Sequence, residues 1–191
     1  MLLSGSISMA ALVPPVLSAG DVTLTFRPFC EEGQDECNEF DVQDPSTLKT
    51  EALKAGDILD VVIVLENPSE LPVRRVRSWL SYDPETLEAT NVGLAETLKS
   101  PIPGEMDIAE EEGLIKIGVL AQDGDIPSDE EIIVARVLFK VKANATGKSP
   151  IAFYDFKDDV KGHTYVASSD TTQNVLSQSL GSLVVQIDAP A

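Results

Sequence analysis

The side chains best suited to binding chemistry alternate along residues 73–82. Successive side chains of a β-strand point to opposite faces, and we assign one set of alternate residues to the core: Val76, Ser78, Leu80 and Tyr82. The other set would then be displayed together: Arg75, Arg77, Trp79 and Ser81. Guanidinium groups bind carboxylates and tryptophan anchors protein interfaces, so the pattern predicts a recognition surface. An alternative stays open, in which a loop covers the tryptophan and the arginines pair with local acids.

Catalytic chemistry is poorly represented. General acid–base catalysis at neutral pH most often uses histidine, and the single histidine, His163, lies in a stretch that is typical of a loop. No Gly-x-Ser-x-Gly, phosphate-binding or His-Glu-x-x-His motif occurs. A two-carboxylate glycosidase would need an aromatic-lined cleft, whereas aromatic residues make up only 5% of the chain. We therefore expect a protein that is not an enzyme.

One acidic loop could supply metal ligands. Asp123, Asp125 and Asp129 offer the oxygen atoms that calcium prefers, although calcium takes about six to eight of them. The glycine of this run stands at the wrong position for an EF-hand loop. We expect no cofactor and a solvated acidic turn, with a structural calcium ion as the alternative.

The charge of the chain limits its partners. Thirty-two acidic residues against fourteen basic ones give a formal net charge of −18. Such a chain is repelled by nucleic acid and by anionic membranes, so neither is an expected partner. The acidity either keeps the protein soluble or adapts it to a saline habitat.

The N-terminal segment is typical of an export signal. Residues 1–19 are apolar and rich in small residues, contain Pro14-Pro15 and end in Leu-Ser-Ala, an acceptable cleavage pattern. They lack a basic start, and they are too short and proline-broken to span a bilayer comfortably. We expect a secreted or cell-surface protein without a membrane span. In an exported chain, the isolated pair Cys30 and Cys37 predicts a disulfide.

The remaining chain suits one β-rich domain over residues 20–188, followed by the start of a linker at residues 189–191. Prolines and glycines at intervals favour many short strands. We expect an insertion over residues 28–54, a short helix over 45–55 with Asp44 as its N-cap, and long connections over 94–112 and 162–182. Strands are expected near 21–27, 57–66, 73–82, 86–93, 114–121, 131–142, 150–156 and 180–188, with another near 163–168 or within 104–109.

An ordered series of five segments resembles the cohesin domain. It begins with Gly56-Asp57, two alternating strands joined at a proline turn, and the corner Tyr82-Asp83-Pro84 with Leu87. The family's central strand, its long following strand and its last two strands are resembled by residues 113–123, 132–147, 151–153 and 181–187. The resemblance covers roughly residues 21–188. It implies an all-β, nine-stranded jelly-roll β-sandwich, here with a short disulfide-bearing insertion.

The resemblance also implies a function, because cohesins are non-catalytic modules that hold a dockerin on one flat outer sheet face. Carried over by position, the partner-binding residues would be Arg75, Arg77, Trp79, Ser81, Lys116 and Leu120, with Gly118 beside them. The best-known cohesins tend to carry acidic or amide side chains where this chain has Arg75 and Arg77. That reversal suggests an acidic or carboxylate-bearing partner, dockerin-like or otherwise.

Three functions follow from these observations. We expect an extracellular protein-binding module, linked to polysaccharide binding or degradation. A self-assembling subunit of a surface layer or filament is the structural alternative, although the charge of −18 disfavours self-association unless cations screen it. Direct carbohydrate binding is a third, which would require a row of exposed aromatic side chains. Paired calcium loops of a dockerin in neighbouring coding regions would discriminate among them.

Overall fold

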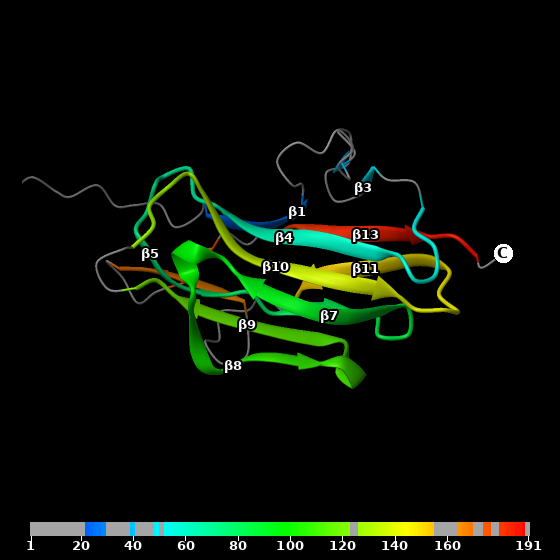
Figure 1. The fold of residues 1–191 in the computed structure, drawn as a ribbon. Coiled ribbons are helices and arrows are strands. Elements are labelled where there is room, and N and C mark those ends of the chain that lie inside the picture. Colours follow the sequence, from blue (N-terminus) through cyan, green and yellow to red (C-terminus); the bar gives the residue numbers. More distant parts are fainter. Residues whose placement is uncertain are drawn as a thin grey trace, which may run out of the picture.

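The computed structural model describes residues 22–29, 39–40, 48–49, 52–122, 126–154, 164–169, 174–176 and 180–189. Within them the chain forms two facing β-sheets and no α-helix, as expected for an all-β sandwich of cohesin type. Figure 1 shows the two layers with their strands running in similar directions. The expected export segment, Cys30, Cys37, Asp123, Asp125 and His163 lie outside the described residues.

The first sheet is antiparallel and has the order β1 (Thr23–Pro28), β4 (Ile58–Glu66), β10 (Glu131–Val141), β7 (Leu87–Leu94). One of its two inner strands, β4, reads ILDVVIVLE, and every second side chain is inaccessible to solvent: Leu59, Val61, Ile63 and Leu65. This alternation is the reason why the segment forms a strand, because it lays one continuous apolar face against the other sheet. The prediction of a strand over residues 57–66 is confirmed.

The second sheet carries the expected recognition residues. Its strands are β12 (Tyr165–Ser168), β5 (Val73–Arg77), β9 (Leu114–Leu120), β6 (Leu80–Tyr82), β11 (Gly147–Phe153) and β13 (Ser182–Ile187), with β8 (Ser100–Ala109) on the far side of β9. Two short 3-10 helices, η1 (Glu96–Leu98) and η2 (Glu110–Glu112), flank β8. A small separate sheet pairs β2 (Glu39–Phe40) with β3 (Leu48–Lys49).

The core lies between the two sheets and is closed by aromatic contacts across them. Phe26 of β1 stacks on Phe153 of β11 with ring centroids 4.5 Å apart. Tyr82 of β6 meets the edge of Phe139 of β10 at 5.4 Å. Offset and edge-on aromatic pairs add about 0.5–1.5 kcal/mol beyond the area they bury. These contacts hold the Tyr-Asp-Pro corner against the opposite sheet.

The strand expected over residues 73–82 is interrupted at Ser78 and Trp79, between β5 and β6. Beside this interruption, β11 ends at Phe153 and β12 begins at Tyr165. The carbonyl of Trp79 accepts hydrogen bonds from Tyr154 N, just after β11, at 2.7 Å and from Thr164 Oγ1, just before β12, at 3.2 Å. The predicted count of nine strands depends on how these interrupted strands are counted, and it stays a prediction.

Two expectations about local structure are wrong. The helix expected over residues 45–55 is absent from the described part of that stretch, where β3 and a bridge at Leu53 stand instead. Leu53 N donates to Gln186 O at 2.9 Å and Asp188 N donates to Leu53 O at 2.8 Å, so pairing with β13 overrides local helix propensity. The connection expected over residues 94–112 contains the ten-residue strand β8. The two regions named as alternatives, 104–109 and 163–168, both contain strands.

The turn between β4 and β5 is held by one buried amide. Asn67 is fully buried, its Oδ1 accepts Leu71 N, and its Nδ2 donates to Leu71 O and to Asp129 O, each at 3.0 Å. The backbone carbonyl of Asp129, a residue considered above as a calcium ligand, therefore accepts a hydrogen bond from the side chain that holds this turn. Because these bonds join the β4–β5 turn to the segment before β10, the amide fixes where β5 enters the second sheet.

Candidate partner-binding face

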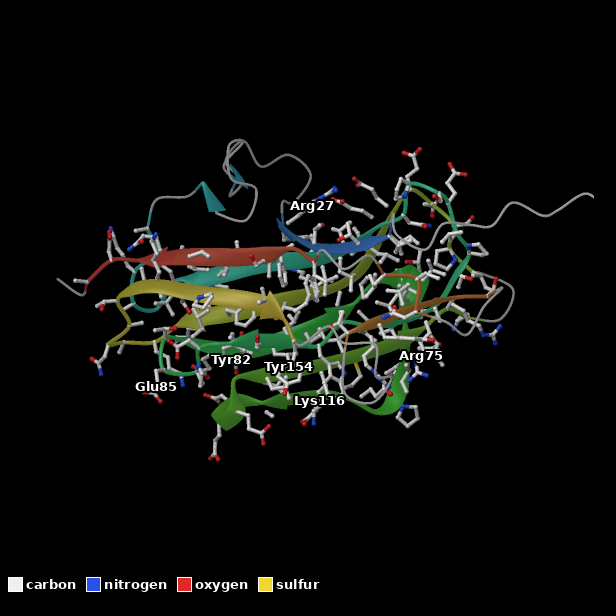
Figure 2. All side chains as sticks on the ribbon, turned by 180° about the vertical axis from the view of Figure 1, so that it is seen from behind. Arg27, Arg75, Tyr82, Glu85, Lys116 and Tyr154 are labelled. Carbon is white, nitrogen blue, oxygen red and sulfur yellow. The ribbon has the colours of Figure 1, made fainter. Side chains whose placement is uncertain are left out.

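The expected recognition residues lie on the outer face of the second sheet, on β5, β6 and β9 and, for Trp79, between β5 and β6. Arg75 stands opposite Leu120 and Arg77 opposite Gly118 in the β5–β9 register, and Lys116 lies further along β9. Figure 2 shows Arg75, Lys116 and Tyr154 on this part of the sheet, away from Arg27 on β1. The four residues assigned to the opposite side are buried as expected: Val76, Ser78, Leu80 and Tyr82.

A bulge of β8 delivers a carboxylate onto this face. Pro101 pairs with Val119 and Met106 pairs with Ile117, so residues 102–105 of β8 stand opposite Gly118 alone. The extra residues turn at Gly104, whose φ of 78° lies in the left-handed region that glycine adopts without steric penalty. Glu105 therefore folds over β9 instead of continuing along the edge of the sheet.

Gly118 makes room for this carboxylate. A Cβ atom at Gly118 would lie 2.3 Å from Glu105 Oε2 and 2.6 Å from Glu105 Cβ. No side chain other than hydrogen fits beneath Glu105 in this conformation. The glycine in the central strand thus has a packing role that explains its presence among β-branched residues.

Glu105 binds both arginines. Arg75 Nη2 donates to Glu105 Oε1 at 2.9 Å and Arg77 Nε donates to Oε2 at 2.9 Å, while Arg77 Nη2 makes a second, short bond to Oε1. The exposed fractions of the side chains are 34% for Arg75, 10% for Arg77 and 15% for Glu105. Burial raises the pKa of the Glu105 carboxyl, but the hydrogen bond from Arg77 and the charges of both arginines outweigh it and hold that pKa below its ordinary value. Glu105 is therefore ionised at neutral pH.

Aromatic rings flank this ionic centre on both sides. The Arg75 guanidinium lies 5.9 Å from the Tyr165 ring centroid, and the Arg77 guanidinium lies 5.6 Å from that of Trp79. Lys116 Nζ lies 5.5 Å from the same tryptophan ring. These are cation–π distances. The arginines are thus held in place by rings as well as by Glu105.

The more exposed part of the face is aromatic. Trp79 is half-buried, and its ring lies 6.4 Å from that of Tyr154, which is 40% exposed. The Trp79 Nε1 donor and the Arg75 Nε donor are buried and have no hydrogen-bond partner within the described chain. Buried donors without an acceptor are rare in folded proteins. Both lie on the same face as the exposed ring.

The sequence predicted which side chains share this face, but not that Glu105 lies over the two arginines. The odd-numbered side chains do share one face with Lys116 and Leu120, yet Arg77 is buried and not displayed. Of the alternative, the part in which the arginines pair with an acid of the same chain is observed. That acid, Glu105, was not predicted because the sequence of residues 94–112 is typical of a connection. Tyr154 and Tyr165 were also missed. Ser81 is half-buried and lies near the carbonyl of Ala152, 3.4 Å from its oxygen.

Elsewhere the described residues hold little that suggests other chemistry. No group of three or more His, Cys, Asp or Glu side chains within them could hold a metal ion. No helix in that part of the chain is long and apolar enough to cross a membrane. An open pocket of about 610 Å³ is lined by residues that include Glu88, Glu110, Val141 and Lys142. Lys142 and Glu110 neutralise one another there at 3.3 Å.

Comparison with known proteins identifies the same family in a family model and in solved structures. A family model described as "Cohesin domain" matches residues 46–175. No curated protein matches the chain. The solution structure of CaCohA2 from Clostridium acetobutylicum is similar at 17% identity and a TM-score of 0.60, over 90% of this chain and 94% of that one.

Two further solved structures have the same fold. A Coh-OlpA–Doc918 complex from Clostridium thermocellum, described as a type I cohesin–dockerin complex, is 18% identical with a TM-score of 0.55 and covers 71% of this chain and 94% of that one. A cohesin module of a family 33 glycoside hydrolase from Clostridium perfringens is 12% identical with a TM-score of 0.58 and covers 88% of this chain and 98% of that one. At these identities the likeness establishes the fold and not the partner.

Proposed function

Because the chain belongs to the cohesin domain family, we propose that it is a non-catalytic module that binds a dockerin-type protein through the outer face of β12, β5, β9 and β8. The observation that carries this location is the half-buried Trp79, which lies beside the exposed Tyr154 with ring centroids 6.4 Å apart. Partly exposed tryptophan and tyrosine side chains are typical anchors of protein interfaces. The likeness to solved cohesin–dockerin complexes supports the class of partner.

A binding panel tests this function. The full chain would be titrated calorimetrically, in calcium-containing buffer, with each dockerin module encoded in the genome of its source. We expect at least one to bind with a dissociation constant of about 1 μM or tighter, that is, about −8 kcal/mol. CaCohA2 with the dockerin of its own complex is the positive control for the assay.

Two outcomes of that panel would contradict the proposal. The function is wrong if none of the dockerins binds while the control pair does. The location is wrong if a dockerin binds and Trp79→Ala leaves its affinity unchanged. Pull-down on insoluble cellulose and xylan, run in parallel, checks for direct carbohydrate binding, for which the Trp79 and Tyr154 rings are poorly aligned because their planes differ by 40°.

The setting that we propose is extracellular, in an assembly that binds or degrades polysaccharide. The export-like segment over residues 1–19 and the pair Cys30 and Cys37 support it. Mass spectrometry of the protein secreted by its source should find a mature chain that begins near Gly20. Peptide mapping without reductant should find Cys30 linked to Cys37, and two free thiols would contradict the predicted disulfide.

A further inference from the structure

Glu105 changes the kind of partner that this face can accept. We propose that Glu105, by occupying the Arg75–Arg77 pair, makes the face select a partner that brings uncharged, apolar side chains to Trp79 and Tyr154 and no carboxylate to the arginines. The inference rests on the proposed function and specifies the chemistry of the partner at the same face. It replaces the expectation of an acidic partner, which assumed that both arginines were free.

The first support is that the arginine pair is already bound to a carboxylate. Glu105 accepts bonds from Nε and Nη2 of Arg77 and from Nη2 of Arg75. Two donor groups of Arg77 are thus engaged, and its side chain is only 10% exposed. A carboxylate of the partner could reach this guanidinium only by displacing Glu105.

The second support is that the position of Glu105 is built into the fold. The bulge of β8 and its turn at Gly104 bring the residue over β9, and the missing side chain of Gly118 leaves the space that it fills. Arginine–carboxylate pairs with two parallel bonds are directional as well as strong. An acidic residue of a partner would have to replace a contact that is preorganised within the chain.

The third support is the balance of charge across the face. Arg75, Arg77 and Lys116 are offset by Glu105 and by Asp107, which lies 3.9 Å from Lys116. Counted over these described residues, the face is therefore close to neutral, on a chain whose formal net charge is −18. A strongly acidic partner would be repelled by the rest of the molecule. What the face offers instead is the exposed Tyr154, the half-buried Trp79 and the half-buried Leu120.

The direction in which Glu105→Gln changes the affinity distinguishes a partner with an apolar contact surface from one that brings a carboxylate. Glu105→Gln keeps the shape of the side chain and removes its charge, so both guanidinium groups lose the carboxylate that they share. A partner with an apolar contact surface would then have to cover two cations without this carboxylate between them, and we expect its affinity to fall at least about tenfold. A partner that brings a carboxylate would lose its competitor, and its affinity would rise.

The experiment uses the dockerin that binds most tightly in the panel, with calorimetry well below the unfolding temperature of each variant. Glu131→Gln is the matched control, since Glu131 binds Arg27 through two bonds of 2.7 and 2.6 Å on the opposite sheet and should leave affinity unchanged. Arg75→Gln is the second variant, because Glu105 keeps its bonds to Arg77. We expect it to change affinity less than about threefold, as for other contacts outside a hot spot.

The possible results are distinguishable from failure of the proposed function. If no dockerin binds the wild-type protein, the function itself is wrong. If one binds, and Glu105→Gln strengthens the complex or Arg75→Gln weakens it more than about tenfold, then a carboxylate of the partner uses the arginines and the inference is overturned. Weakening by Glu105→Gln, with Arg75→Gln and Glu131→Gln nearly neutral, supports it.

Discussion

Replacement of Glu105 by glutamine should also lower the stability of the free protein, by an amount that the structure bounds. The carboxylate accepts three bonds from two guanidinium groups at a site where its side chain is 15% exposed. A hydrogen bond to a charged group contributes about 1.5–3 kcal/mol, and removal of one partner from a buried ion pair costs about 3–5 kcal/mol. Glutamine keeps one acceptor oxygen and Arg75 is 34% exposed, so we expect a loss of about 2–3 kcal/mol.

The loss should depend on pH in a defined direction. The pKa of Glu105 in the folded protein lies below its ordinary value, despite burial, because Arg77 and Arg75 stabilise the charged form. A carboxyl with a lowered folded-state pKa contributes stability that is complete above its unfolded-state pKa of about 4.3 and disappears as the pH falls through the folded-state pKa. The difference between wild type and Glu105→Gln should therefore be full at pH 7 and should shrink below about pH 4.

Urea unfolding of the two proteins at a series of pH values measures this difference directly, and the other carboxylates cancel in it. Glu131→Gln is again the matched control, because its pair with Arg27 has similar geometry but Glu131 is 57% exposed. Exposed ion pairs contribute about 0–1 kcal/mol, so its loss should be much smaller. Equal losses in the two variants, or a loss for Glu105→Gln that is the same at pH 3.5 and pH 7, would refute the assignment of a buried, ionised carboxylate.

Three further changes test other parts of the structure. Trp79→Ala should weaken dockerin binding by about 2 kcal/mol while the protein stays folded by thermal unfolding; a variant that fails to fold would assign Trp79 to the core. Gly118→Ala should expel Glu105, since its Cβ would lie 2.3 Å from Oε2 and 2.6 Å from the Cβ of that residue, and in a double-mutant cycle it should cost little more once Glu105→Gly has removed those atoms; additive losses would count against the packing argument. Asn67→Ala removes the three hydrogen bonds of a fully buried side chain and should cost about 3 kcal/mol in urea unfolding; a loss below about 1 kcal/mol would show that the turn holds without them.

Strands whose side chains alternate, or are apolar throughout, could be predicted from the sequence. Residues 57–66, 114–121 and 131–142 were expected as strands and correspond to β4, β9 and β10 within about a residue at each end. Such patterns are local, because each strand carries its own buried face. The outward row of residues 75–81 was found for the same reason, since a period of two fixes which side chains share a face.

Strand β8 could not be predicted in the same way. Its first half contains Pro101, Pro103 and Gly104, which are typical of a connection. Proline is tolerated here because, among the described strands, β8 pairs with β9 alone and lies at the edge of the sheet, where an amide hydrogen is not required on the outer side. Whether a segment can form such a strand depends on the neighbour that it meets, and that information is not contained in the segment itself.

The charge of the recognition face illustrates the same limit and its consequence for function. Arg75 and Arg77 alternate locally and so could be placed on one face, but their compensation by Glu105 joins positions 28 and 30 residues apart. This contact requires the bulge of β8 and Gly118 of β9, and the role of either feature can be recognised only once β8 and β9 are known to pair. A row of arginines read from sequence therefore predicts where a partner contacts the sheet more securely than it predicts the charge of that partner. The charge is decided by which side chains the fold brings over the row.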